Sequence, residues 1–125
     1  MIVLAPISVG ELIDKITILK IKSNLITDSD KLINIEKELQ SLEELKDELN
    51  LDLDSVDPLQ NELYKVNLEL WHIENYKREC EKNQTFGDDF VNTARQVYLK
   101  NDLRAEIKRR INTMVGSTII EEKSY

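Results

Sequence analysis

The chain has 125 residues, which is enough for one domain with its own hydrophobic core. Only three glycines and two prolines accompany a charged content of 33%, and this mix favours helices over an all-β fold or a disordered chain. The net charge of −7 disfavours nucleic acid and anionic membranes as partners, and a single cysteine excludes an internal disulfide or a two-thiolate zinc site.

The chain opens with a short apolar segment, residues 1–7, which we expect to be extended. The segment is too short for a membrane span, which needs about 20 apolar residues. It also lacks the basic start of a signal peptide, so we expect a cytoplasmic protein. Residues 8–11 (S-V-G-E) then have the form of a capping box and predict a first helix over about 9–24. Its core-facing stripe contains Leu12, Ile13, Ile16, Leu19 and Ile21.

A second helix is predicted over about 30–49, after cap-forming residues at 27–30. Its leucine-rich seam is narrow, like that of a coiled coil, and we therefore expect a homodimer. Residues 28–57 hold eleven acids and three bases, a net charge of −8, so the rest of this helix should face water. The seam residues are Leu32, Ile35, Leu39, Leu42 and Leu49.

A third helix is predicted to start at Asp57 and Pro58, with the aspartate as N-cap and the proline in the first turn. It should end near Asn83. Because the connection between the second and third helices is short, we expect these two to be antiparallel neighbours.

A fourth helix should begin at Asp88 or Asp89 and stop at Gly116, a residue type suited to a helix C-terminus. Residues 117–120 are β-prone and could run along residues 2–4 as a two-stranded ribbon. The predicted fold is therefore all-α, with four helices in two antiparallel hairpins and short extended ends, in a single domain over 1–125.

The fourth helix carries an unusual polar row. Residues 90–125 have a net charge of +3, and the stripe that starts at Val97 continues through Asn101, Arg104 and Lys108 before it becomes apolar again. Arginine offers a planar fork to a carboxylate or phosphate, and lysine adds a point charge. One interpretation is a groove for a small anion, completed by the first helix. The candidate ligand-binding residues are Glu11, Lys15, Asn101, Arg104, Lys108 and Arg109.

A second interpretation of the same helix is an ordinary solvated face, in which Asp102 pairs with Arg109. The chain end at 121–125 (E-E-K-S-Y) likewise leaves two alternatives open. It is either a frayed terminus or a segment that folds back, with Glu121 and Glu122 pairing with bases of the fourth helix.

Other chemistry-bearing residues give weak signals. Glu69 and His72 have the Glu-x-x-His spacing of di-iron bundles, but such a site needs two copies of that motif, and we expect no metal and no cofactor. Cys80 has acidic neighbours, which disfavour a reactive thiolate. No phosphate-binding loop or nucleophile elbow is present.

Several segments resemble an uncharacterised family of short bacterial helical proteins. The similar segments are 5–15 (A-P-I-S-V-G-E-L-I-D-K), 70–74, 86–90, 101–112 and 116–125. Segment 101–112 contains N-D-L-R and K-R-R-I-N, and segment 116–125 contains G-S and E-E-K-S-Y. The resemblance implies that both chain ends belong to the fold. It also implies a link to cell-surface polysaccharide biology, since genes of this family neighbour those of glycosyltransferases.

Three functions remain open at this point. The leading hypothesis is a non-catalytic helical binding or interaction module, whose partner is a second copy or another protein, because no catalytic constellation is present. The alternative is a small-anion binding protein or a chorismate-mutase-like isomerase, which would hold a dicarboxylate by electrostatic contacts. No arginine precedes Arg78, so Lys15, Lys20 or Lys22 would have to supply the first-helix contact of such an enzyme. The third is a scaffolding subunit for an envelope-glycan enzyme.

Overall fold

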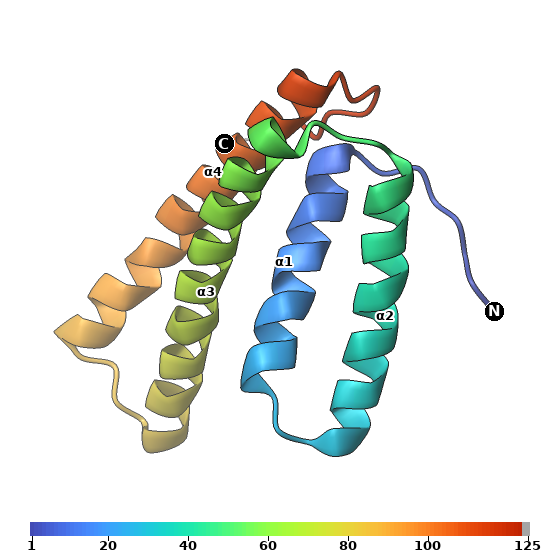
Figure 1. The fold of residues 1–125 in the computed structure, drawn as a ribbon. Helices are drawn as coiled ribbons and strands as arrows, with labels where there is room; N and C mark the ends of the chain where they lie inside the picture. The colour runs from blue at the N-terminus through green and yellow to red at the C-terminus, as the bar shows by residue number, and fades with distance from the viewer. Residues whose placement is uncertain (124–125) are drawn as a thin grey trace.

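A computed structural model describes residues 1–123, and these form four helices and no strand (Figure 1). The helices are α1 (Val9–Leu25), α2 (Ser29–Glu48), α3 (Leu53–Asn83) and α4 (Asp88–Val115). The predicted all-α fold is therefore confirmed. None of these helices is both long enough and apolar enough to cross a membrane.

The helix ends follow the capping signals of the sequence. Ser8 accepts a hydrogen bond at Oγ from the backbone N–H of Glu11 (3.0 Å), which starts α1. Asp28 accepts from the backbone N–H groups of the first turn of α2. α4 ends at Val115 and is capped by Gly116, whose φ of 68° lies in the left-handed region that glycine adopts without strain.

The predicted start of α3 is wrong. The helix begins at Leu53 with Asp52 as N-cap, so Pro58 lies inside the helix rather than in its first position. The backbone N–H of Val56 bonds to the carbonyl of Asp52 at 3.0 Å, and the Val56 side chain is fully buried. This buried anchor lets the first turn form before the proline, which removes a single hydrogen bond near the helix start.

α1 lies between α2 and α3, and it is in contact with every other helix (Figure 1). α2 packs on α1 alone, whereas α3 pairs with α4. The expectation that the second and third helices are packed neighbours is therefore wrong. α1 carries apolar residues on more than one side, so it separates the two. Lys46 still bridges them at the connection, with Nζ 2.7 Å from Oε1 of Gln60.

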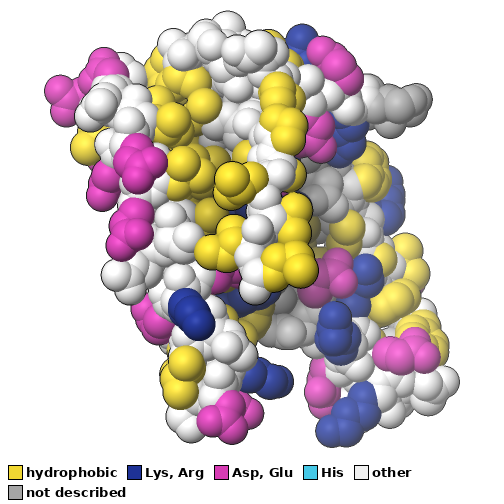
Figure 2. All heavy atoms as spheres, turned by 90° about the vertical axis from the view of Figure 1, so that its right-hand side faces the viewer, with side chains coloured by type: hydrophobic (Ala, Val, Ile, Leu, Met, Phe, Trp, Pro, Cys, Tyr) yellow, Lys and Arg dark blue, Asp and Glu magenta, His cyan; other side chains and the backbone are white. Residues whose placement is uncertain are grey.

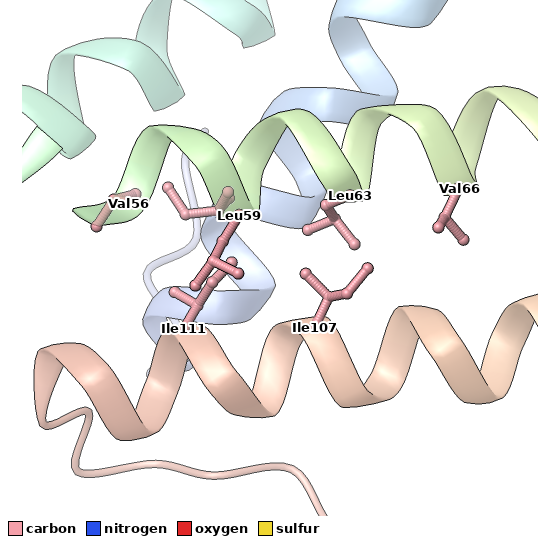
Figure 3. Close-up of a cluster of buried hydrophobic side chains, with 7 residues drawn as sticks. Val56, Leu59, Leu63, Val66, Ile107 and Ile111 are labelled. Atoms are coloured by element: carbon pink, nitrogen blue, oxygen red, sulfur yellow. The ribbon is translucent and has the colours of Figure 1, made fainter. Parts of the chain in front are cut away.

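The main core lies where α1, α3 and α4 meet. In Figure 3, Leu59 and Leu63 of α3 point toward Ile111 and Ile107 of α4. Burial of one such side chain contributes roughly 1.5–3 kcal/mol, so this cluster fixes the C-terminal half of α4 against the other helices. The buried cluster consists of Ile13, Val56, Leu59, Leu63, Val66, Ile107 and Ile111.

The two chain ends do not pair with each other. Residues 1–7 extend away from the helices and are exposed, on a face where hydrophobic side chains gather (Figures 1 and 2). Neither they nor residues 117–120 form a strand, so the predicted two-stranded ribbon is wrong. Residues 117–123, which we call the C-terminal strap, are instead attached to α4 by side-chain ion pairs. Ser124 and Tyr125, the last residues of the closing motif, lie outside the described residues.

Candidate anion-binding site between α1 and α4

α1 and α4 approach each other closely at Gly10. Its backbone N–H donates to Oδ1 of Asn112 at 2.6 Å. A Cβ at this position would lie 2.6 Å from the backbone carbonyl oxygen of Lys108, which is closer than real Cβ contacts. Glycine therefore allows the start of α1 to rest on α4, and this contact brings Glu11 and Asp14 of α1 over the polar row of α4.

Asp14 is a fully buried carboxylate, with an exposed fraction of 0%. Nε and Nη2 of Arg104 donate to its two oxygens at 2.9 and 2.5 Å, in the bidentate geometry that arginine and carboxylate favour. Nδ2 of Asn67, on α3, donates to Oδ1 of Asp14 at 2.9 Å and to Oγ1 of Thr17 at 2.8 Å. Three helices thus hold one ion pair, in which the carboxylate is buried and the guanidinium is partly exposed.

Arg104 is fixed on one edge and open on the other. Its side chain is 29% exposed, and Nη1 makes no hydrogen bond with any of residues 1–123. The hydrogen bonds that Arg104 donates to Asp14 raise the pKa of Arg104 above its ordinary value, against the opposite effect of burial. The guanidinium is therefore a permanent, positioned cation whose remaining N–H groups can donate to a ligand.

Lys108 lies one turn further along α4 and is 9% exposed. Its Nζ donates to Glu11 at 2.6 Å and to Glu121 of the C-terminal strap at 2.7 Å. Burial alone would lower the pKa of Lys108, but these two hydrogen bonds outweigh it and raise the pKa above the ordinary value of 10.5. Lys108 is therefore a charged anchor for the strap, already bound to two carboxylates.

The C-terminal strap carries two further ion pairs. Glu122 accepts from Nη1 of Arg109 at 3.0 Å, and Nζ of Lys123 lies 2.7 Å from Oδ1 of Asp102. The alternative in which the chain end folds back is thus confirmed over the frayed terminus for residues 121–123. The expected pairing of Asp102 with Arg109 is wrong, because Asp102 pairs with Lys123 and Arg109 pairs with Glu122, both in the C-terminal strap.

An open pocket of about 490 Å³, which we call the anion pocket, lies between α1, α4 and the C-terminal strap. Four of the six predicted residues line it, whereas Lys15 and Arg109 do not. Lys15 is exposed with Nζ 3.8 Å from Glu11, and Arg109 faces a neighbouring hollow on α4. The lining residues are Glu11, Asn101, Arg104, Ala105, Lys108, Glu121 and Lys123.

A second pocket, of about 370 Å³, lies on the other side of Arg104, between α1, α3 and α4. We call it the ring pocket. Arg104 lines both pockets, so its guanidinium is shared between them. The ring pocket is lined by Ile18, Ile21, Asn67, Leu70, Trp71, Glu74, Asn75, Arg78 and Arg104.

The remaining chemistry-bearing residues lie outside both pockets. His72 is exposed, Cys80 is buried, and Glu69 forms an ion pair with Lys100 at 2.5 Å. Among residues 1–123, no group of three or more His, Cys, Asp or Glu side chains is placed to hold a metal ion.

Asp14 and Asn67 were missed as site residues in the sequence. The signal for Asp14 was its position between the apolar residues of α1, where a charged side chain needs a buried partner. Asn67 gives the same signal in α3, because it follows Val66 and precedes Leu68 and Leu70.

Fold and site together define a small four-helix protein with a buried carboxylate–arginine pair between two pockets. The chain belongs to the DUF6165 family, a family of unknown function, whose model matches residues 3–125. The resemblance seen in the sequence to an uncharacterised family is therefore confirmed. No curated protein and no solved structure matches the chain.

Proposed function

We propose that the protein is a non-catalytic helical binding module that holds a small anion, a carboxylate or a phosphate group, at Arg104. The observation that supports this proposal is the buried Asp14, which binds Nε and Nη2 of Arg104 and leaves Nη1 unused in a residue that lines the anion pocket. A side chain that is already fixed loses little conformational freedom when a ligand binds, so the site is preorganised.

The charges around the anion pocket argue for a binding module rather than for an isomerase. The three cations of the anion pocket (Arg104, Lys108 and Lys123) are paired with four carboxylates (Asp14, Glu11, Glu121 and Asp102), so the pocket has no excess positive charge. A chorismate-mutase-like enzyme would need several cations without such partners to hold a dicarboxylate. We therefore expect one anionic group to bind, with a dissociation constant on the order of 1 mM for inorganic phosphate, or about −4 kcal/mol.

The test is thermal unfolding in phosphate, acetate and chloride at equal ionic strength. Ligand at 100 times its dissociation constant stabilises the folded state by about 2.7 kcal/mol. Arg104→Lys keeps the charge but loses the fork, so it should abolish the phosphate-specific rise in melting temperature. Arg95→Lys is the matched control, because Arg95 is exposed on α4 and lines neither pocket.

Two results would count against the proposal. One is a melting temperature that phosphate and chloride change equally, because a bound phosphate would add to the stabilisation that phosphate already gives folded proteins by its exclusion from their surface. The other is the same phosphate effect in Arg104→Lys, Arg95→Lys and the unchanged protein.

A second candidate, a protein-interaction module, is favoured by a different observation. The apolar side chains of Met1, Ile2, Val3 and Leu4 are exposed in the extended N-terminal segment. A second copy in a homodimer, or an envelope-glycan enzyme scaffolded in the bacterial cytoplasm, would cover such a surface. Light scattering over a wide range of concentrations tests the homodimer, and a constant monomer mass would remove it.

A further inference from the structure

We propose that the ring pocket holds the ring of the same ligand whose anionic group binds Arg104, so that the ligand is a ring-bearing monophosphate. This inference rests on the proposed function, because Arg104 is the residue that joins the two pockets. It goes further by assigning a second subsite and a class of ligand.

The ring pocket has the composition of a small-molecule site. Its volume of about 370 Å³ lies in the range of roughly 300–1,000 Å³ that is typical of ligand pockets. The apolar side chains of Ile18, Ile21 and Leu70 line it together with the half-buried indole of Trp71. An indole beside aliphatic side chains offers a flat apolar surface, which suits a planar base or the C–H face of a sugar ring.

Polar groups in the ring pocket are placed to orient such a ring. Asn67 uses both N–H bonds of its amide on Asp14 and Thr17, so the orientation of the amide is fixed. Its Oδ1 accepts no hydrogen bond from residues 1–123 and can accept one from a ligand hydroxyl or N–H. Asn75 supplies a second amide to the same pocket.

Arg78 supplies the charge that selects an anion. It is exposed, lines the ring pocket and makes no ion pair or hydrogen bond within residues 1–123. The charge of Arg104 is balanced by Asp14, and Glu74, the one carboxylate of the lining, lies 3.4 Å from Nζ of Lys77. Arg78 is therefore the uncompensated cation of the ring pocket, so a ligand whose phosphate binds Arg104 meets a second guanidinium group on the ring-pocket side.

The ring can come from two sources that share this chemistry, a nucleoside monophosphate or a hexose phosphate. Trp71 is the only tryptophan of the chain, so its fluorescence reports directly on the ring pocket. We would titrate the full chain with AMP, UMP, glucose 6-phosphate and inorganic phosphate, and follow both Trp71 emission and the melting temperature.

We expect a nucleoside monophosphate or the hexose phosphate to cause saturable quenching or a spectral shift of Trp71 emission, and inorganic phosphate to cause neither. The class of organic phosphate that binds more tightly identifies the ring. Arg78→Gln should weaken binding roughly tenfold, the loss of one charge-assisted contact. Since Arg78 is exposed and makes no contact that folding requires, this variant should fold normally. Arg95→Gln is the matched control and should bind as the unchanged protein does.

Failure of the inference is distinguishable from failure of the proposed function. If no organic phosphate changes Trp71 emission while inorganic phosphate still raises the melting temperature through Arg104, the ring subsite is overturned and the anion site stands. If Arg78→Gln binds the organic phosphate unchanged, the assignment of Arg78 is overturned. If no phosphate of any kind has an effect, both proposals fail.

Discussion

Replacing Asp14 by asparagine tests the buried ion pair with almost no change in shape. The carboxylate accepts two hydrogen bonds from Arg104 and one from Asn67. An amide has one oxygen and one NH₂ group, and neither Arg104 nor Nδ2 of Asn67 can accept from that NH₂ group. At least one of the three donors therefore loses its partner in Asp14→Asn, and the charge of Arg104 is left uncompensated.

The expected loss of stability in Asp14→Asn follows from the burial of Asp14 and Arg104. Removal of one member of a buried ion pair costs about 3–5 kcal/mol. Asp14 is fully buried, but the Arg104 side chain is 29% exposed and can regain water, which lowers the cost to about 2–3 kcal/mol. That loss is a large part of the roughly 5–15 kcal/mol by which domains are stable.

Urea unfolding followed by circular dichroism is the assay. With a slope of roughly 1–3 kcal/mol per molar urea, the midpoint of Asp14→Asn should fall by about 1–3 M, with the slope unchanged. Glu62→Gln is the control, since Glu62 and Arg110 form an exposed ion pair at 3.4 Å that should be worth less than about 1 kcal/mol.

A double-mutant cycle separates the ion pair from its surroundings. Asp14→Asn combined with Arg104→Gln should lose less stability than the sum of the two single changes, because both remove the same interaction. A loss below about 0.5 kcal/mol in Asp14→Asn, or strict additivity in the cycle, would refute the account of Asp14 as the buried anchor of Arg104.

Three further predictions concern Gly10, Glu121 and Lys108, which lie where α1, α4 and the C-terminal strap meet. Gly10→Ala should destabilise the protein by about 1–3 kcal/mol in urea unfolding, because the new Cβ meets the Lys108 carbonyl at 2.6 Å; unchanged stability would mean that the helices do not approach so closely. Glu121→Gln should tighten phosphate binding in the thermal assay, because a carboxylate leaves the anion pocket, and equal or weaker binding would contradict that role. Because the pKa of Lys108 is raised in the folded protein, its stabilising effect is complete below about pH 10.5 and is lost as pH rises through the folded value. The difference in melting temperature between the unchanged protein and Lys108→Met should therefore shrink in strongly alkaline buffer, and a constant difference would be inconsistent with the bonds from Lys108 to Glu11 and Glu121.

Local signals in the sequence were sufficient to predict most of the helix ends. Ser8 and Asp28 cap helices through their own side chains, and Gly116 adopts a left-handed conformation that glycine takes without strain, so each acts through neighbouring residues. The start of α3 was missed because it depends on the burial of Val56, which is a tertiary contact. The separation of α2 from α3 by α1 is tertiary as well, since a short connection limits distance but does not choose the packing partner.

Part of the candidate site could be predicted from the sequence, because that part depends on positions along one helix and not on contacts between helices. Asn101, Arg104 and Lys108 lie on one stripe of a helix, and helical periodicity alone places them together. Asp14 belongs to a different helix, and only the contact at Gly10 brings it to Arg104. The pairing of Lys108 with Glu121 was among the alternatives in the sequence, but a choice between a folded-back and a frayed end required the structure.

The central claim is that Asp14 holds Arg104 so that its open edge binds an anion, and the side-chain Nε–H signal of Arg104 in a ¹⁵N–¹H NMR spectrum tests it most directly. The hydrogen bond from Nε to Asp14 (2.9 Å) should protect this proton from exchange with water. Titration with phosphate should move the signal in a saturable way, whereas the same titration of Asp14→Asn should show a weakened or absent response. A signal that stays in place while phosphate is added to the folded protein would contradict the account.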